Sequence, residues 1–315
     1  MKNFYLGTIG ALLLSLGAGV CHADDATQWL DRMGVALHEQ DYQGTFIYMR
    51  GSQFETIQVT HQFKDGRELE RLVYQNGEER EIVRRDNELV CYHPDPHNAD
   101  FDHNLPLGPF STAFNDNLAT SQDLYRFSLH GKERIAGRTA VKLKITPRHD
   151  NRFGYRLWLD EETGLLLQSQ LVDRNRVLEL FQFSSIQIGQ PIDTAMLNSS
   201  FGDTAAVHQL SPVITEVAEQ QSSRPVWRVS WLPDGFKPMY SRQSNLLHFT
   251  DGLATLSVFV EQTGTASLPD MTTSHGATTV ITRRLKNAQG QITVVGEVPV
   301  NMARRVAESV EPALF

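Results

Sequence analysis

Apolar and polar residues alternate along most of the chain between residues 42 and 187. In TIQVTHQF (56–63), every second residue from Ile57 to Phe63 falls on one face of an extended segment, which is the period of a half-buried strand. Further predicted strands are RELERLVYQ (67–75), EEREIVRR (78–85), DLYRFSLH (123–130), AVKLKITPR (140–148), GYRLWLD (154–160), LLLQSQLVD (165–173) and VLELFQFSSI (177–186). Turn signals at Asn76-Gly77, 160–164 and 173–175 separate neighbouring strands, so the pattern predicts an antiparallel meander that curls into an open or closed barrel.

One helix precedes these strands. In DATQWLDRMGVALHEQ (25–40), Asp25 is a suitable N-cap and the apolar residues from Trp29 to Leu37 recur at helical spacing. A helix laid across the concave side of a curled sheet leaves an apolar slot, which suits a lipid chain. The candidate lining residues are Ile57, Val59, Phe63, Leu72, Phe127, Val141 and Leu143. Plain packing in the core is the alternative for each of them.

A second domain follows a change in composition. Residues 208–224 lose the alternation and gain Ser, Gln and Pro, which predicts a linker between residues 24–207 and 225–315. Shorter strands follow in PVWRVSWLP (225–233), NLLHFTDG (245–252), LATLSVFVE (253–261), ATTVITRRL (277–285) and QITVVGEVP (291–299). A helix over VNMARRVAESVEPALF (300–315) closes the chain, with one apolar face. We therefore expect a small α+β domain, a sheet with one covering helix.

The first residues predict export. Lys2 is followed by an apolar run over residues 10–20 that is too short to cross a bilayer, and then by Cys21-His22-Ala23. This is typical of a signal peptide over residues 1–23, cleaved after Ala23. A lipoprotein anchored through Cys21 is the alternative, which the bulky Val20 disfavours. Cleavage leaves Cys91 as the single cysteine, so we expect no intramolecular disulfide.

The charge is unevenly distributed between the two domains. Residues 24–221 carry 19 Lys and Arg against 30 Asp and Glu, whereas the chain from Ser222 onward carries nine against seven. An acidic domain joined to a mildly basic one argues against nucleic acid as a partner. Local arginines, Arg156 among them, are the candidates for binding an anion. The candidate phosphate or partner contacts are Arg148, Arg152, Arg224, Arg228, Arg283 and Arg284.

The chain lacks the common catalytic motifs HExxH, GxSxG and CxxC. The stretch CYHPDPHNADFDH (91–103) collects thiol, imidazole and carboxylate groups, but ligands on one extended strand lie in a row about 7 Å apart and cannot surround one metal ion. A polar loop at the rim of the slot is the favoured interpretation, with histidines that titrate near pH 6.5. A metal-dependent hydrolase centred on His93, His97 and His103 is the alternative. We expect no enzyme, no cofactor and no resident metal.

Three blocks carry a resemblance to a known family. ALHEQDYQGTFIYMRGSQFETIQVTHQF, GRTAVKLKITPRHDNRFGYRLWLDEETGLLLQSQLVD and WLPDGFKPMYSRQSNLLHFTDGLATLSVFVE resemble the RseB/MucB family, with the likeness running from about Gln28 to Ala307. The acidic and histidine-rich stretch around Asp100 is similar to the MucB branch, which is associated with alginate control. The resemblance implies an N-terminal unclosed antiparallel β-barrel with helices in its concavity, as in lipoprotein carriers, and a smaller C-terminal domain.

The resemblance also implies a function. Members of this family are periplasmic negative regulators of the envelope-stress sigma-factor pathway. Such a protein binds the periplasmic part of a membrane-spanning anti-sigma factor, is peripheral to the inner membrane through that partner, and shields the partner from site-one proteolysis. Lipopolysaccharide or a related acylated lipid then releases the partner. A periplasmic lipid or lipoprotein carrier chaperone is the alternative function, and the sequence leaves monomer and homodimer open.

Overall fold

The computed structural model describes residues 23–86, 88–94, 123–201, 206–210, 226–239, 241, 243–261, 269–285 and 290–313. The predicted signal peptide lies outside these residues except for Ala23, which begins the first helix, α1 (Ala23–Glu39). His97, His103 and Arg224 also lie outside them, as does most of the predicted linker.

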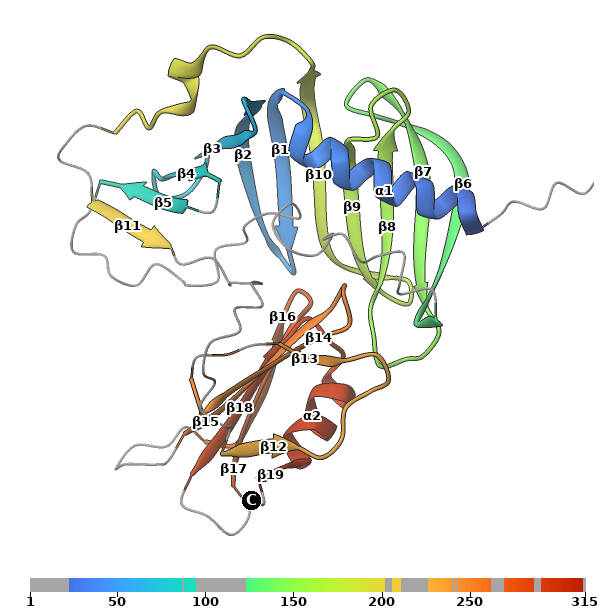
Figure 1. Ribbon diagram of the computed structural model, residues 1–315, viewed down its shortest axis with the longest axis vertical. Helices are drawn as coiled ribbons and strands as arrows, with labels where there is room; N and C mark the ends of the chain where they lie inside the picture. The colour runs from blue at the N-terminus through green and yellow to red at the C-terminus, as the bar shows by residue number, and fades with distance from the viewer. Residues whose placement is uncertain are drawn as a thin grey trace, which may run out of the picture.

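Eleven strands of the described chain form one antiparallel sheet that stays open (Figure 1). They are β1 (Tyr42–Arg50), β2 (Gln53–Lys64), β3 (Arg67–Tyr74), β4 (Glu81–Arg85), β5 (Glu88–His93), β6 (Tyr125–Ile135), β7 (Arg138–Pro147), β8 (Gly154–Asp160), β9 (Leu166–Asp173), β10 (Arg176–Ile188) and β11 (Ala206–Leu210). The order is β11-β5-β4-β3-β2-β1-β10-β9-β8-β7-β6, so β11 and β6 are free edges rather than partners. The mainly β fold with an unclosed N-terminal sheet is confirmed.

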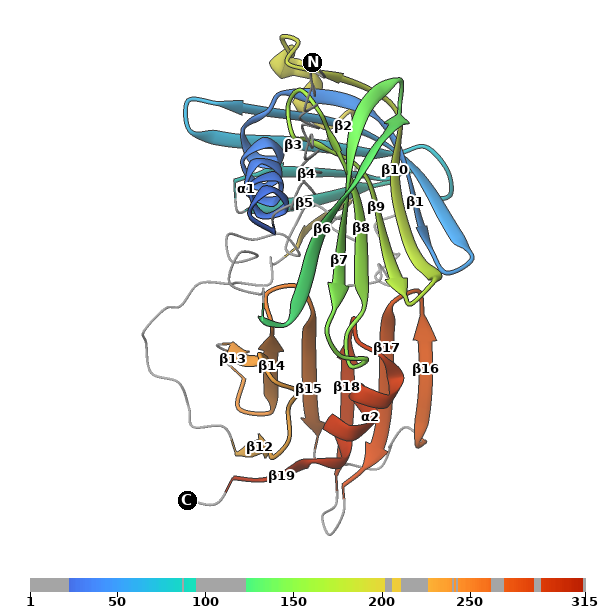
Figure 2. The same cartoon turned by 90° about the vertical axis from the view of Figure 1, so that its right-hand side faces the viewer.

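Helix α1 crosses one face of this sheet (Figures 1 and 2). Its contacts reach β2, β9 and β6, which places it across the curve rather than along one strand. The apolar side of the helix, from Ala26 through Leu30 and Met33 to Leu37, is buried against the sheet in the largest hydrophobic cluster of the described residues. Burial of that helical stripe holds α1 in place, because most of the stability of a helix in a protein comes from packing of its apolar face.

Two boundaries of this domain differ from the sequence prediction. The β3–β4 connection spans six residues instead of a two-residue turn at Asn76-Gly77. Asn76 accepts a hydrogen bond from the backbone N–H of Thr56 and donates one to the carbonyl of Phe54, so its side chain ties the loop back to β2. The predicted linker begins at residue 208, but β11 continues to Leu210 because it pairs with β5 as an edge strand.

The second domain is a smaller sheet with one covering helix (Figure 2). Its six strands are β13 (Lys237–Met239), β14 (Leu246–Thr250), β15 (Thr255–Glu261), β16 (Met271–His275), β17 (Thr278–Arg284) and β18 (Gln291–Gly296), in the order β13-β14-β15-β18-β17-β16. Helix α2 (Val300–Glu308) packs on β17 and β18, and its buried residues join a second hydrophobic cluster. The smaller α+β domain is confirmed.

Helix α2 ends earlier than the predicted helix over residues 300–315. It stops at Glu308, and the chain continues as β19 (Val310–Pro312), which pairs with β12 (Trp227–Val229) in a separate two-stranded sheet. Pro312 explains the difference, because proline disfavours helix at the residue before it and cannot donate a helical hydrogen bond itself. The strand pair joins the two ends of the second domain.

Candidate functional site

The predicted slot is filled where the structure describes it. Six of the seven candidate lining residues are buried, namely Ile57, Val59, Leu72, Phe127, Val141 and Leu143, and all of these except Val141 belong to the same cluster as the apolar side of α1. Phe63 differs, because 37% of its surface is exposed near the end of β2. The structure thus gathers five of the seven residues in one packed cluster with α1, whereas Val141 is buried outside that cluster and Phe63 is partly exposed.

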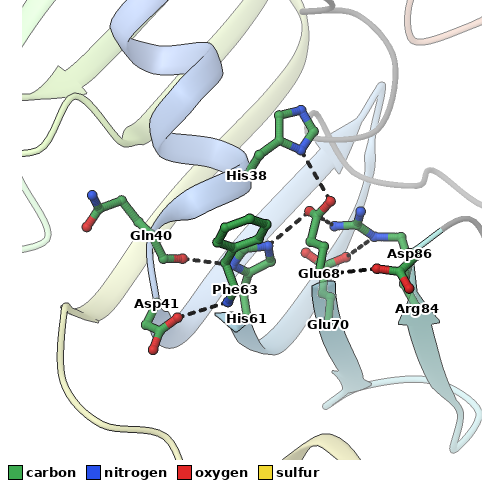
Figure 3. Close-up of polar contacts among 9 residues, drawn as sticks. All are labelled: His38, Gln40, Asp41, His61, Phe63, Glu68, Glu70, Arg84 and Asp86. Carbon is green, nitrogen blue, oxygen red and sulfur yellow. Dashed lines mark hydrogen bonds and ion pairs between the residues drawn. The ribbon is translucent and has the colours of Figure 1, made fainter. Parts of the chain in front are cut away.

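A polar cluster fastens the C-terminal end of α1 to the sheet (Figure 3). Glu68 of β3 lies at its centre, with its carboxylate 3.3 Å from Nδ1 of His38, 3.0 Å from Nε2 of His61 and 2.6 Å from Nη2 of Arg84. His38 comes from α1, His61 from β2 and Arg84 from β4, so the Glu68 carboxylate joins three other elements to β3. Glu70 adds a second carboxylate 3.4 Å from Arg84 Nε.

Burial opposes the charge on Glu68, but hydrogen bonds from His38, His61 and Arg84 outweigh it and hold the pKa of this carboxyl well below its usual range. His61 is fully buried and stacks on Tyr42, with ring centroids 4.6 Å apart. Its Nδ1 lies 2.8 Å from the carbonyl of Gln40 and its Nε2 faces Glu68. The ring therefore lies between the backbone of Gln40 and the carboxylate of Glu68.

The two domains meet at a buried ion pair. Arg152, in the β7–β8 turn, donates from Nε to Oδ2 of Asp251 over 2.5 Å, and both side chains have no exposed surface. Tyr125 donates its hydroxyl to the same oxygen over 2.9 Å, and Oδ1 of Asp251 accepts the backbone N–H groups of Leu253 and Ala254. Arg152 also donates to the carbonyl of the second-domain residue Asp234. This set of contacts holds the β14–β15 turn against the first domain.

A second contact between the domains centres on Glu179 of β10. Its Oε2 accepts the hydroxyl of Tyr48 over 2.6 Å, and its Oε1 accepts the backbone N–H of Ala277 over 3.0 Å. Gly276 lies so close that a Cβ added there would sit 2.5 Å from Cγ of Arg50, and its φ of +59° is also costly for other residues. The β16–β17 turn therefore needs glycine to seat against β1 and β10.

Glu297 of the second domain faces this contact. Burial, reinforced by the nearby charge of Glu179 and only partly offset by Arg50, raises its pKa to about 7. Two carboxyl groups share one arginine across the domain boundary, so the contact gains or loses a negative charge near neutral pH.

The arginines selected from the sequence lie in different parts of the structure. Arg148 and Arg152 line a cleft between the domains together with Arg156. Arg228 pairs with Glu311 and Arg283 with Glu308 on the surface of the second domain. The side chain of Arg284 is exposed at the end of β17. Arg152 pairs with Asp251, and its contact with a phosphate or a partner stays a prediction. The Arg283-Arg284 pair divides between two environments.

The stretch CYHPDPHNADFDH is visible only at its start. Cys91 and His93 are buried in β5, which pairs with β4 and β11, and burial raises the pKa of the Cys91 thiol. The rest of the stretch from Asp95 lies outside the described residues, so the rim-loop interpretation stays a prediction. Within the described part of the chain, no three His, Cys, Asp or Glu side chains gather as metal ligands. Neither described helix is long and apolar enough to cross a bilayer.

Sequence reasoning missed the residues that join the domains. Asp251 and Glu179 lie in segments selected only for their strand pattern, and their partners are about 100 residues away along the chain. The turn signal at Asp251-Gly252 was the only local hint. Such pairings depend on which faces of two domains meet, and no local pattern encodes that.

Comparison with known proteins agrees with the two-domain architecture. The family model described as the MucB/RseB N-terminal domain matches residues 25–201, and the MucB/RseB C-terminal domain model matches residues 221–311. The chain is 35% identical to "Sigma factor AlgU regulatory protein MucB" of Pseudomonas aeruginosa, covering 96% of this chain and 97% of that protein. It is 30% identical to "Sigma-E factor regulatory protein RseB" of Escherichia coli K12, covering 96% and 95%.

Solved structures lead to the same family. The structure described as the complex of Pseudomonas aeruginosa MucA/MucB superposes with a TM-score of 0.74 at 33% identity, covering 92% of this chain and all of that one. A crystal structure of MucB in complex with MucA(peri) gives a TM-score of 0.72 at 34% identity and the same coverage. Both domains and their order in the chain are shared, and the protein belongs to the MucB/RseB family.

Proposed function

We propose that this protein is a periplasmic negative regulator of the envelope-stress sigma-factor pathway. It binds the periplasmic part of a membrane-spanning anti-sigma factor and shields it from site-one proteolysis. The observation that carries the proposal is that a relative similar over both domains, at a TM-score of 0.74, is solved in complex with MucA. The relatives are named as sigma-factor regulatory proteins rather than as enzymes, and we propose no catalysis.

Lipopolysaccharide or a related acylated lipid is the proposed releasing signal. Within the described residues, the apolar slot beneath α1 is packed, with Val59 and Leu143 fully buried. An acyl chain therefore enters by displacing α1 from the sheet rather than by filling an open hole. The Glu68 cluster opposes that displacement, because it fastens the last turn of the helix to β3 and β4. Lipid binding and loosening of α1 are coupled in this proposal.

A periplasmic lipid or lipoprotein carrier chaperone is the second candidate. The open sheet with a helix across one face favours it, since displacement of α1 exposes a continuous apolar surface. A carrier hands its lipid to an acceptor membrane, whereas a regulator keeps its lipid while the partner leaves. Transfer of a fluorescent fatty acid from the loaded protein to acceptor vesicles separates the two.

The test of the proposed function is capture of the periplasmic domain of an anti-sigma factor on immobilised protein, followed by competition with purified lipopolysaccharide. Saturable capture that lipopolysaccharide reverses supports the proposal. Absence of capture argues against the anti-sigma factor as partner. Capture that lipopolysaccharide leaves unchanged argues against the lipid as the releasing signal. The second readout uses the same beads, so the two steps are judged separately.

A further inference from the structure

The second domain meets the first at one end of its six-stranded sheet (Figure 2). The β14–β15 and β16–β17 turns at that end enter the first domain, where Leu253 and Ala277 are buried in its hydrophobic cluster. Glu297 follows β18, the strand between β15 and β17, so it lies between the two turns. Its backbone N–H donates to the carbonyl of Thr255 at the start of β15. The strand order thus places one carboxyl at the centre of the contact between the domains.

The charges at this contact do not balance when all of its carboxyl groups are ionised. Nε of Arg50 lies 3.6 Å from Oε1 of Glu179, and Nε of Arg152 lies 2.5 Å from Oδ2 of Asp251. Each of these arginines thus has a carboxylate of its own. Glu297 is a third carboxyl, and its side chain makes no hydrogen bond or ion pair within the described part of the chain. One proton on Glu297 leaves the contact with equal positive and negative charge.

The ionisable groups that surround Glu297 also include three phenols and an imidazole. The phenols approach from β1, β6 and β8 and are those of Tyr48, Tyr125 and Tyr155. Burial raises the pKa of all three phenols, so they stay neutral. The charge of Glu179 acts on Glu297 more strongly than the charge of Arg50. The imidazole is that of His275 at the exposed rim, where a Cβ added at Gly51 would lie 3.8 Å from its Cε1.

We propose that this contact is a proton-linked hinge, in which uptake of one proton by Glu297 seats the second domain against the first and loss of that proton opens the contact. A carboxylate that is withdrawn from water without a counter-charge is costly, and the molecule removes the cost either by binding a proton or by admitting water. Acid therefore favours the joined domains and alkali favours the open ones. The hinge is a property of the chain without any partner, so it does not rest on the proposed function.

The size of the effect follows from the two environments of Glu297. In the joined arrangement, burial and the charge of Glu179 raise its pKa to about 7. In the open arrangement the carboxyl meets water and its pKa returns toward the ordinary value of 4.5. The joined form binds more protons between these two values, so it becomes less favoured as the pH rises from about 4.5 through 7. From pH 5.5 to pH 8, the ratio of open to joined molecules is expected to rise about 25-fold.

Hydrogen exchange of the Ala277 amide measures the opening. This N–H donates across the domain boundary to Oε1 of Glu179, so it exchanges with solvent when the contact opens. Its protection factor, corrected for the pH dependence of exchange in a free amide, is measured in the full chain at pH 5.5 and pH 8. Two contact variants are Glu297→Gln, which removes the titrating group, and Glu179→Gln, which leaves two carboxyl groups for the two arginines. Two controls are Glu261→Gln, which removes an exposed carboxyl from the second domain, and His275→Gln, which removes the imidazole at the rim.

We expect the protection factor of Ala277 to fall about 25-fold between the two pH values in the wild type and in both controls. In both contact variants it should change by less than about threefold, because neither leaves an excess carboxylate at the contact. A wild-type change below about threefold overturns the proposal. A full change that persists in either contact variant overturns it as well, and so does a change that disappears in His275→Gln.

Arg152→Met shows whether the domains open as one unit or the β16–β17 turn frays alone. Arg152 binds Asp251 in the other turn of the contact, so it does not touch Ala277 directly. Faster exchange of the Ala277 amide in Arg152→Met supports a hinge that opens both turns together. An unchanged exchange rate assigns the opening to local fraying and overturns the hinge.

Discussion

The buried pair of Arg152 and Asp251 links the two domains, and its removal is predicted to separate them. Replacing Arg152 with methionine keeps much of the side-chain volume but removes every donor. Asp251 then keeps the Tyr125 hydroxyl and the N–H groups of Leu253 and Ala254, yet it loses its counter-charge in a site with no exposed surface.

The size of the effect follows from that burial. Leaving one member of a buried ion pair without its partner costs about 3–5 kcal/mol, whereas an exposed pair contributes about 0–1 kcal/mol. Arg152→Met is therefore predicted to lower the melting temperature by about 6 °C or more, on the usual scale for chains of this size. Arg228→Met breaks the exposed pair with Glu311 and is the matched control, with little change expected. The double variant Arg152→Met with Asp251→Asn should lose about 2 kcal/mol less stability than the sum of the losses in the two single variants.

Denaturant unfolding of the wild type, Arg152→Met, Asp251→Asn and the double variant gives the coupling energy. Small-angle scattering gives the radius of gyration. A larger radius in Arg152→Met at temperatures where the sheet signal by circular dichroism is intact is the expected sign of separated domains. A coupling energy below about 0.5 kcal/mol together with an unchanged radius would refute this reasoning.

Two further predictions concern pH. Glu297 has a pKa raised to about 7, so the free energy of unfolding falls as the pH rises from about 4.5 through 7 and this carboxyl ionises. Glu297→Gln should remove that pH dependence and stabilise the protein by about 2–3 kcal/mol at pH 8, with exposed Glu261→Gln as the control. A pH dependence of the denaturant midpoint that Glu297→Gln leaves unchanged contradicts this prediction. Glu68 has the opposite shift, so its contribution is present above the ordinary carboxyl range and lost as the pH falls below about 4.5. Glu68→Gln should cost about 2 kcal/mol at pH 7 and progressively less as the pH falls below about 4.5, and hydrogen exchange in α1 should rise at neutral pH. Equal costs at pH 7 and pH 3 count against the fastening role.

The sequence predicted the sheet because its strands are amphipathic and joined in order by local turns. Ile57, Val59 and Leu143 were placed on the dry face from period alone, and that face is buried. The same logic failed at Phe63, whose side chain is 37% exposed near the end of β2. It also failed at the end of α2, where a helical pattern beyond Glu308 is overridden by pairing of β19 with β12.

The site was less accessible to sequence reasoning. Arg148 and Arg156 were selected for their charge, but the role of Arg152 depends on Asp251, 99 residues further along the chain. The Glu68 cluster draws on α1, β2, β3 and β4, and none of its members stands out as a motif. Local periodicity reports which side of an element is buried, and it carries no information on which polar groups meet there.

The most direct test of the central claim is proteolysis of the periplasmic domain of the cognate anti-sigma factor by the site-one protease. The account predicts that stoichiometric protein slows cleavage in a saturable manner and that lipopolysaccharide restores it. The Arg152→Met variant, whose domains are predicted to separate, is run beside the Arg228→Met control. Cleavage that proceeds at the same rate with and without the wild-type protein would contradict the account.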